Sequence, residues 1–408
     1  MLIAAPDHVL AIQSAAWRAD PYPLFAELRD RLPVARLDWP AHGAGDWLVT
    51  RHADVVAALR HPLLVVSRTG GVPALRTAPG QRTADPNEPL QHTVLTTDGD
   101  DYLPLRTRTA RATAALTPAA EQRVIAHVAR IARDLRARRR CDLVGDFAQP
   151  VCEAIWSDLM AIDIAGVRRL SVLSAAYLEQ GFIFGHGPVK ESARAAIAGM
   201  RDMLRTTLAA NAARDDIGFL GSVATDFGRS RADAISVTNT AVLLTAAMLQ
   251  TTRHAIVNCL AALIARPDDW RLLRDQPALV PQAIEECLRF DGPSQAVGRV
   301  ATQALCLGGR TIPRGGFIRL AVASANRDGA RHPAADRIDL HRPPLPHLAF
   351  GRALHSCSGA RLARLVLRHS LRAFGQAFAH PMIEPAGIVR ETESSLRGYR
   401  RLCVTLAG

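Results

Sequence analysis

The chain has 408 residues, of which 48% are hydrophobic and 22% are charged, and its mean hydropathy is +0.04. These values are typical of a soluble globular protein that buries a large core. The formal net charge is +12, and arginine carries nearly all the positive charge because Lys190 is the only lysine. Since the arginines are scattered and no basic run alternates with aromatic residues, we expect no nucleic-acid partner.

The spacing of the cysteines and the first residues of the chain indicate the cellular compartment in which the protein is expected. The seven cysteines are spread without any CxxC pair, which argues against a disulfide framework or a zinc site and favours a reducing, cytoplasmic environment. Residues 1–20 lack a basic region followed by an unbroken apolar stretch, so no secretory signal is expected. The longest apolar run is about nine residues, which is too short to span a membrane.

Helical periodicity dominates the chain. Apolar residues recur at spacings of three and four, as amphipathic helices require, in residues 23–32, 121–139, 190–214 and 277–290. β-Prone runs are few, at 46–50 and at 304–322, where glycine and proline punctuate the sequence. We therefore predict a mainly α fold with small antiparallel β-sheets, organised as one domain over residues 1–408.

Two further segments suggest where a ligand binds. Residues 67–97 are rich in Gly, Pro, Thr and Arg and are long for a connection, which is typical of a binding loop or lid. The longest predicted helix covers about residues 232–265 and is apolar nearly all round, so we expect it at the centre of the protein. Polar residues 250–252 interrupt it. Such a buried polar cluster is either hydrogen-bonded within the helix or functional.

Residues 347–364, HLAFGRALHSCSGARLAR, surround Cys357 just before helical periodicity resumes. This cysteine could be a structural thiol, a nucleophile activated by His355, or a zinc ligand, although neither an orienting acid nor further metal ligands follow. It could also be an axial thiolate on haem iron. That role needs a glycine-permitted loop, N–H groups at a helix N-terminus, and polar or cationic groups for the propionates. The segment offers all three.

The same segment resembles the haem-binding loop of cytochrome P450 monooxygenases, whose pattern is Phe-Gly-x-Gly-x-His-x-Cys-x-Gly-x-x-Leu-Ala-Arg. Ala353 stands where the pattern has its second glycine. The matching residues are Phe350, Gly351, His355, Cys357, Gly359, Leu362, Ala363 and Arg364. The resemblance implies the cytochrome P450 fold and a haem b that is ligated by the Cys357 thiolate, lies between this loop and the long helix, and is contacted by Phe350 and Gly359.

Other segments resemble the same family in the same chain order. Glu286 and Arg289 match its Glu-x-x-Arg signature, and three residues apart on a helix they share a face. The resemblance implies that they form a buried ion-pair network with Arg337, which locks the core on the haem side.

The resemblance also implies a set of haem propionate partners. Tyr102 stands where bacterial members usually have a histidine, four residues before Arg106, and a tyrosine hydroxyl can still donate a hydrogen bond. The expected partners are Tyr102, Arg106, Arg299 and His355.

The long helix resembles the family's distal helix but departs from its Ala-Gly-x-Asp/Glu-Thr-Thr pattern, which here reads AMLQTT at 247–252. Met248 replaces the glycine, which predicts a bulky thioether where the helix opens a groove for oxygen. Gln250 replaces the acid, and an amide cannot relay protons at ordinary pH. The oxygen-side alcohol, Thr251, is retained. The predicted catalytic residues are therefore Thr251 and Gln250.

By the same resemblance, the substrate pocket is formed by the 67–97 loop together with residues from several helices and turns. The predicted lining residues are Phe182, Phe184, Leu243, Ala247, Met248, Ala296, Val297, Ser394 and Ser395.

Two activities remain open. One is monooxygenation of a small organic molecule, in the class of bacterial secondary metabolites. The other is oxidative C–C or C–N coupling of phenols or indoles without oxygen insertion, which Gln250 and Met248 motivate. A non-catalytic helper protein of the same fold is a third reading, against which the intact Cys357 loop argues.

The expected partners follow from what the chain does not carry. It holds no flavin or iron–sulfur module in the given sequence, so the resemblance implies electrons from a ferredoxin and its ferredoxin reductase. Arg106, Arg352 and Arg361 are candidates for a basic docking face, and no membrane partner is expected.

Overall fold

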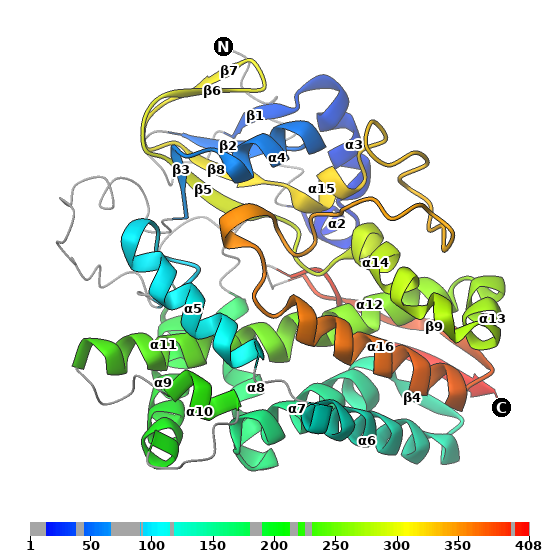
Figure 1. Cartoon of the computed structure of the whole chain (residues 1–408). Helices are drawn as coiled ribbons and strands as arrows, with labels where there is room; N and C mark the ends of the chain where they lie inside the picture. Colours follow the sequence, from blue (N-terminus) through cyan, green and yellow to red (C-terminus); the bar gives the residue numbers. More distant parts are fainter. Residues whose placement is uncertain are drawn as a thin grey trace.

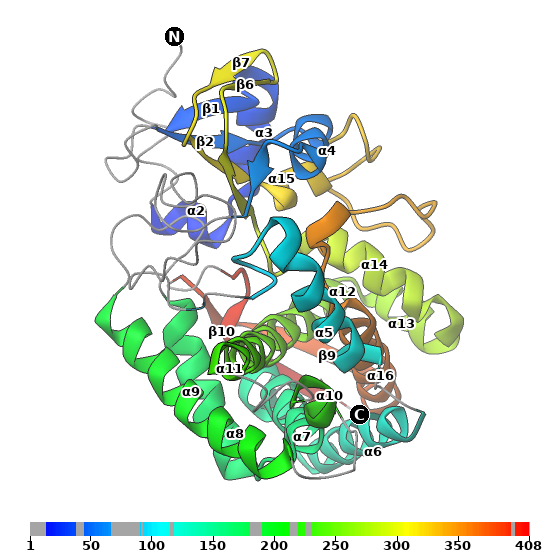
Figure 2. The same ribbon diagram turned by 60° about the vertical axis from the view of Figure 1, so that its left-hand side comes forward.

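The computed structural model describes residues 14–37, 45–66, 90, 93–114, 118–179, 190–212, 219–224, 231–392 and 396–407. A β-rich part and a helical body lie on opposite sides of a long central helix (Figures 1 and 2). The loop that carries Cys357 lies between the end of the β-rich part and α16 (Ala360–Ala377).

The helical body is built from segments that each bury an apolar stripe. In α16 the buried side chains Leu362, Val366, Leu371 and Phe374 follow one another at spacings of three to five, so one face of this helix joins the core. The other helices of this part are α5 (Tyr102–Ala114), α6 (Pro118–Asp134), η3 (Leu135–Ala137), η4 (Leu143–Ala148), α7 (Gln149–Met160), α8 (Ile164–Leu178), α9 (Glu191–Ala212), α10 (Phe219–Ala224), α13 (Pro267–Asp275), η6 (Pro277–Leu279) and α14 (Val280–Asp291).

A five-stranded sheet in the order β1-β2-β8-β5-β3 forms the β-rich part. Its strands are β1 (Val34–Leu37), β2 (Asp46–Val49), β3 (Leu64–Val65), β5 (Val297–Ala301) and β8 (Phe317–Leu320). Here β2 and β8 run parallel, while the other pairs are antiparallel. The predicted mainly α fold with small sheets is therefore confirmed, and the sheets are antiparallel except for this one pair, whose strands are far apart in the chain and are not joined by a hairpin.

Two smaller sheets and several short helices complete the fold. The hairpin of β6 (Leu305–Leu307) and β7 (Arg310–Ile312) turns at Gly308 and Gly309, whose positive φ values of 53° and 74° suit glycine. The remaining elements are β4 (Arg140–Asp142), β9 (His380–Arg390) and β10 (Tyr399–Ala407), which form one antiparallel sheet, and α2 (Ala15–Ala19), α3 (Tyr22–Arg31), α4 (His52–Arg60), η2 (Gly99–Asp101), α15 (Val322–Asn326) and η7 (Ala353–His355).

The central helix consists of α11 (Arg231–Ala246), η5 (Ala247–Thr252) and α12 (Arg253–Ile264). It confirms the long helix predicted from the sequence. The η5 segment has π-helical hydrogen bonding, which is rare and is often found at functional sites. Its position coincides with the polar interruption seen in the sequence.

Among the described residues, one stretch, Ala234–Ile264, is long and apolar enough to cross a membrane by those two criteria alone. In its most apolar window, 67% is buried inside the protein. The apolar character of this helix therefore matches its place in the core.

Candidate active site

The Cys357 loop is a tight turn between η7 and α16. The Cys357 N–H donates to the Phe350 carbonyl at 2.8 Å, which closes the loop on itself. Gly351 has φ 67°, a conformation that glycine adopts without strain. Ala353 has φ 62°, so this alanine takes up the left-handed conformation that the family's second glycine would suit.

The Cys357 thiol lies at the N-terminus of α16. Backbone N–H groups of Gly359 and Ala360 donate to its sulfur. Solvent reaches this residue, but the surrounding protein displaces water from the sulfur and raises the pKa of the Cys357 thiol. The two N–H groups and the guanidinium groups of Arg106 and Arg364 act in the opposite direction. These donors and charges would stabilise a thiolate, as an iron ligand requires.

Two predicted propionate partners on α5 contact the cysteine loop. The Tyr102 hydroxyl donates to the Leu354 carbonyl at 2.6 Å. The Arg106 guanidinium donates to the Ser356 carbonyl and to the Ser358 hydroxyl, both at 2.6 Å. Burial raises the pKa of Tyr102, against the effect of Arg106. Both side chains therefore contact the same loop, which is consistent with their spacing of four residues on α5.

The other two predicted propionate partners lie close to this pair. Arg299 on β5 is 5% exposed, and its charge acts on Tyr102. The ring of His355 lies 4.5 Å from that of Tyr102, and its Nε2 is 3.0 Å from the Asp98 carboxylate. The structure therefore brings Tyr102, Arg106, Arg299 and His355 together beside the Cys357 loop.

The long helix packs against α16 through η5, and η5 presents two of the predicted residues to solvent-accessible space. Ala247 is exposed although its helical neighbours Ala246 and Met248 are buried. Thr251 is half-buried, and its hydroxyl donates to the Ala247 carbonyl at 2.6 Å. Since these two positions are one turn apart, they define one accessible face in the middle of an otherwise buried helix.

Gln250 points away from this face. It is 1% exposed, and its amide nitrogen donates to the Ser171 carbonyl on α8 at 2.8 Å. The side chain thus links the π-helical segment to α8. Among the described contacts, no hydrogen bond joins Gln250 to Thr251.

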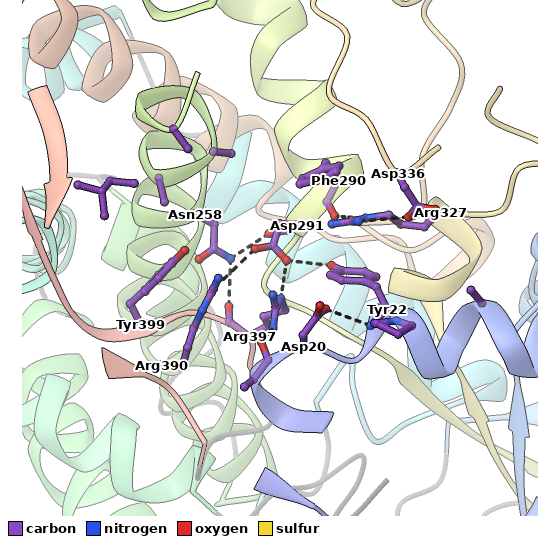
Figure 3. Close-up of a pocket in the computed structure, with 17 residues that line it drawn as sticks. Asp20, Tyr22, Asn258, Phe290, Asp291, Arg327, Asp336, Arg390, Arg397 and Tyr399 are labelled. Atoms are coloured by element: carbon purple, nitrogen blue, oxygen red, sulfur yellow. Dashed lines mark hydrogen bonds and ion pairs between the residues drawn. The ribbon is translucent and has the colours of Figure 1, made fainter. Parts of the chain in front are cut away.

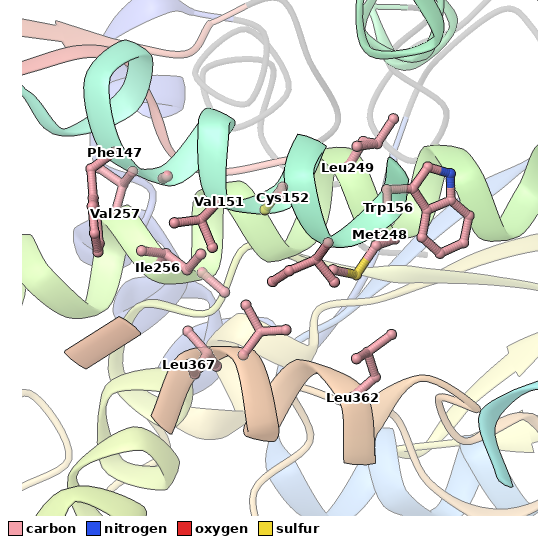
Figure 4. Packing of buried hydrophobic residues seen from close by; sticks show 14 of the residues in the cluster. Phe147, Val151, Cys152, Trp156, Met248, Leu249, Ile256, Val257, Leu362 and Leu367 are labelled. Atoms are coloured by element: carbon pink, nitrogen blue, oxygen red, sulfur yellow. The ribbon is translucent and has the colours of Figure 1, made fainter. Parts of the chain in front are cut away.

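Met248 is where the structure corrects the sequence prediction. It is 7% exposed and belongs to the main hydrophobic cluster, where its sulfur accepts from the Thr252 hydroxyl at 3.5 Å. Figure 4 shows it directed into the packing between α7 and α16, with Trp156 and Leu362 nearby. Met248 therefore does not line the predicted pocket or fill an oxygen groove, because it is Ala247, one residue earlier, that faces the accessible side.

The remaining pocket predictions divide into three groups. Val297 is half-buried, whereas Leu243 and Ala296 are 7% and 4% exposed and lie in the protein interior. Residues Phe182, Phe184, Ser394 and Ser395, and most of the 67–97 loop, lie outside the described residues.

A buried ion-pair network forms around Glu286 on α14. One of its members differs from the prediction. Arg289 donates through Nε and Nη2 to the two Glu286 oxygens, each at 2.8 Å. The second cation is Arg342, whose Nε lies 3.0 Å from the same carboxylate. Arg337 was the predicted partner, but its side chain is exposed and only its carbonyl accepts, from Arg289 and Arg342. The prediction for Arg337 is therefore wrong.

The neighbouring Glu285 is a structural residue that sequence reasoning missed. Its carboxylate accepts from Arg364 Nε at 2.7 Å and contacts His347 at 3.1 Å, so it connects α14 to both ends of the cysteine segment. Burial opposes its ionisation, but the hydrogen bonds from Arg364 and His347 lower the pKa of Glu285 to about 2. Arg364 also lies over the Phe350 ring at 4.5 Å. The signal that could have identified Glu285 from the sequence is its position directly before Glu286 in the Glu-x-x-Arg segment.

These observations fit a haem b with a thiolate ligand. The Cys357 sulfur receives two backbone N–H groups, four polar or cationic side chains gather beside its loop, and an alanine–threonine face of the central helix is accessible. A single thiolate with backbone N–H donors and nearby cationic side chains is the donor set of a haem-thiolate site.

Comparisons with known proteins agree with this geometry. A family model described as Cytochrome P450 matches residues 266–395. Cytochrome P450 107B1 of Saccharopolyspora erythraea is 32% identical over 362 residues, which cover 86% of this chain and 85% of that protein. The 20-oxo-5-O-mycaminosyltylactone 23-monooxygenase of Streptomyces fradiae is 30% identical, with 98% of this chain and 94% of that protein covered.

A solved structure extends the likeness to the fold. The LnmA cytochrome P450 hydroxylase from the leinamycin biosynthetic pathway of Streptomyces atroolivaceus superposes with a TM-score of 0.78 at 30% identity, covering 95% of this chain and 97% of that one. The chain therefore belongs to the cytochrome P450 family, and it is a cytochrome P450 oxidoreductase whose cofactor is a cysteine-ligated haem b.

Proposed function

We propose that this protein is a monooxygenase that inserts one atom of dioxygen into a small organic molecule, in the class of bacterial secondary metabolites. The observation that carries the proposal is the Cys357 sulfur at the N-terminus of α16, which receives two backbone N–H groups, combined with the accessible Ala247–Thr251 face of the central helix. When bound, the haem supplies the oxygen-activating iron chemistry, which a thiolate ligand promotes.

In this proposal, residues around the loop hold the cofactor. Cys357 would provide the sulfur ligand, and the Gly359 and Ala360 N–H groups favour its thiolate form. Tyr102, Arg106, Arg299 and His355 provide donors and positive charge for the propionates. Phe350, braced by Arg364, provides an apolar contact beside the loop.

Thr251 is the proposed catalytic residue of the distal side. Its hydroxyl lies on the accessible face and donates to the Ala247 carbonyl, so its oxygen can accept from water, and its hydrogen becomes available for proton transfer when the bond to Ala247 is released. Gln250 cannot release a proton, and its amide nitrogen is engaged with α8. We therefore assign to Gln250 a positioning role, in which it fixes the π-helical turn, and we assign proton delivery to water that reaches Thr251.

The substrate class rests on the relatives and on the apolar residues near this face. The Streptomyces fradiae relative is named as a monooxygenase of 20-oxo-5-O-mycaminosyltylactone, and the LnmA hydroxylase belongs to leinamycin biosynthesis. Ala247 and Val297 offer mainly apolar contacts. Together they support a bulky, largely apolar small molecule as substrate.

The electron donor in this proposal is a ferredoxin supplied by its reductase in the cytoplasm. Arg361 is exposed and Arg352 half-exposed, and both are close in sequence to Cys357. A basic surface there suits an acidic ferredoxin.

The first test is the carbon monoxide difference spectrum of the reduced protein. We expect a Soret band at the position of thiolate-ligated haem. The Cys357→Ala variant should lose this band, whereas Cys287→Ala should keep it because Cys287 is a buried core thiol on α14. Absence of haem from the parent protein, or survival of the band in Cys357→Ala, would contradict the proposal.

One observation favours the second activity, oxidative coupling. Gln250 leaves the distal helix without its acid, which matters less when the substrate supplies its own hydrogens. Met248, the other motivation, lies in the core and gives no support. Turnover under labelled dioxygen decides between the two: a labelled product establishes monooxygenation, and a dimeric or ring-closed product without label establishes coupling.

A further inference from the structure

A second cavity, of about 550 Å³, lies away from the Cys357 loop, between α3, the end of α14, α12 and the β9–β10 sheet (Figure 3). Its size falls in the range of roughly 300–1,000 Å³ that small-molecule sites occupy. Asn258, which lines it, is seven residues beyond Thr251 on the central helix, or about 10 Å along the helix axis. The cavity is therefore separate from the proposed active site.

One wall of the cavity is a rigid hydrogen-bonded frame. The Tyr22 hydroxyl donates to Asp291 Oδ1 at 2.9 Å, and Arg397 Nε donates to the same oxygen. The Arg327 guanidinium lies over the Tyr22 ring at 3.6 Å and over the Phe290 ring at 3.5 Å. This frame leaves the second Asp291 oxygen, Oδ2, without a hydrogen bond in the described part of the protein.

Asn258 presents an acceptor without a partner. Its amide nitrogen donates to the backbone carbonyls of Asp291 and Arg397, at 2.9 and 3.1 Å. Because both partners are acceptors, the amide can have only one orientation, and Oδ1 must point to the other side. Asn258 is 3% exposed, and its Oδ1 has no hydrogen-bond partner among the described residues. A buried oxygen of this kind requires a donor.

Arg390 presents the complementary donor. Its Nη1 is buried and lacks a hydrogen bond to any described residue, and it forms only a long ion pair with Asp291 Oδ2, at 3.9 Å. The guanidinium lies over the Tyr399 ring at 4.0 Å. The hydroxyl of Tyr399 likewise has no partner within the described structure. Two acceptors and two donors on residues that line one cavity therefore lack hydrogen bonds to the described residues.

The charges of the cavity balance. Its described lining includes three carboxylates and three guanidinium groups, Asp20, Asp291, Asp336, Arg327, Arg390 and Arg397. A ligand that is neutral overall but carries both signs suits this arrangement better than an anion or a cation alone. Apart from Asn258 and the two tyrosines, the rest of the lining is apolar and includes Ala261, Ala262 and Ile383.

We propose that this cavity binds a free α-amino acid with an apolar or aromatic side chain. The ammonium group donates to Asn258 Oδ1 and Asp291 Oδ2. The carboxylate accepts from Arg390 and from the Tyr399 hydroxyl. The side chain packs on the alanines of α12 and on Ile383. Both charged ends of the ligand thereby meet polar atoms that the protein itself leaves unsatisfied.

The test uses the haem-loaded protein with 4-phenylimidazole present, so that ligands of the iron-side pocket are excluded. Calorimetric titration with L-phenylalanine should show binding at one site. Phenylpropionate, which lacks the ammonium group, and phenethylamine, which lacks the carboxylate, should each bind at least roughly tenfold more weakly, because each leaves a charged partner unpaired. No binding of phenylalanine, equal binding of the three compounds, or binding only without the azole would overturn the proposal.

Variants locate the site. Arg390→Gln and Tyr399→Phe should each weaken phenylalanine binding, the first by roughly tenfold or more and the second by less, because a charged hydrogen bond contributes more than a neutral one. Neither change removes a hydrogen bond that the described fold uses. Arg401→Gln, at an exposed position of β10 outside the cavity, is the matched control and should leave the affinity unchanged. Equal affinities in Arg390→Gln and Arg401→Gln would contradict the assignment.

Discussion

At the scale of single residues, the cysteine loop carries a conformational cost at Ala353. This residue has φ 62° and an exposed side chain, so its Cβ strains the backbone without contributing to packing. A left-handed conformation costs a non-glycine residue about 1–2 kcal/mol. Glycine would remove that strain, but it loses about 0.5–1 kcal/mol of chain entropy on folding.

We therefore expect Ala353→Gly to stabilise the protein slightly, by up to about 1 kcal/mol. The free energy of unfolding in urea measures the change. Ala110→Gly, at an exposed position within α5, is the control and should destabilise by about 1 kcal/mol, because helical backbone favours alanine. A loss of stability in Ala353→Gly equal to that of the control would show that the loop carries no strain.

The residues around Cys357 could be predicted from the sequence because they are contiguous or are placed by regular spacing. Gly351, Cys357 and Gly359 sit in one short loop, where their order alone fixes their neighbours. Tyr102 and Arg106 were predictable as a pair because four residues on a helix share a face. Glu285 was missed because its partners, His347 and Arg364, come from a distant loop and helix.

At the scale of secondary-structure elements, the central helix shows why Met248 was misplaced. A regular helix turns about 100° per residue, but the π turn at 247–252 takes more residues per turn and so shifts the phase of the side chains. The sequence does not reveal this shift, so it cannot show which of the two adjacent residues, Ala247 or Met248, faces the accessible side. The structure places Ala247 there and Met248 in the core.

Met248→Ala should consequently act on stability rather than on chemistry. Removing a buried methionine side chain costs about 2–5 kcal/mol of unfolding free energy. We expect this loss in urea unfolding, together with an unchanged ratio of product formed to reducing equivalents consumed. If a fully folded Met248→Ala protein showed an altered ratio of product to reducing equivalents, Met248 would have to act in oxygen activation after all.

The ion-pair network on α14 shows a similar limit of prediction from sequence, here for the choice of an arginine partner. Glu286 and Arg289 are three residues apart on α14, so local spacing predicts their pairing. Arg342 reaches them from an irregular segment 56 residues after Glu286, and no periodicity signals which arginine of that segment turns inward. Arg337 and Arg342 are equally plausible in the sequence.

Alanine substitutions separate the two arginines. Arg342→Ala removes one of the two cations from the buried Glu286 carboxylate, and we expect a loss of about 3–5 kcal/mol in unfolding free energy. Arg337→Ala should change it by less than about 0.5 kcal/mol, because only the Arg337 backbone carbonyl takes part. Similar effects of the two variants would contradict the observed network.

At the scale of the whole molecule, what could be predicted depends on how far apart the contacting segments are. The helical class and the β6–β7 hairpin follow from local patterns and from Gly308–Gly309. The parallel pairing of β2 with β8 does not, because it joins strands far apart in the chain, and strand sequences alone carry no signal for their partner.

Packing of distant segments also creates a buried histidine pair. His332 is 0% exposed, and neither ring nitrogen has a partner among the described residues. Its ring meets that of His52 from α4 at 5.9 Å in an edge-on arrangement. Burial, and then the charges of Arg289, His52, Arg331 and Arg342, lower the pKa of His332 to about 4. Burial also lowers the pKa of His52.

This shift makes the stability of the protein depend on pH. In the unfolded chain His332 takes up a proton near pH 6.5, but in the folded protein only near pH 4, so the unfolded state binds more protons between these values. Stability is therefore unaffected by this residue above pH 6.5 and falls as the pH drops toward 4. From pH 7.5 to 5.5 the expected loss from His332 is about 1 kcal/mol.

The variant His332→Phe should remove that loss, since phenylalanine has a similar shape and no titrating group. Its unfolding free energy in urea, measured at pH 7.5 and 5.5, should fall by about 1 kcal/mol less than that of the parent protein over the same interval. At pH 7.5 it should be at least as stable as the parent, because two buried nitrogens without partners are gone. His380→Phe, at an exposed position of β9, should keep the parent's dependence on pH. If His332→Phe kept it as well, the acid sensitivity of the protein would have to arise from other groups.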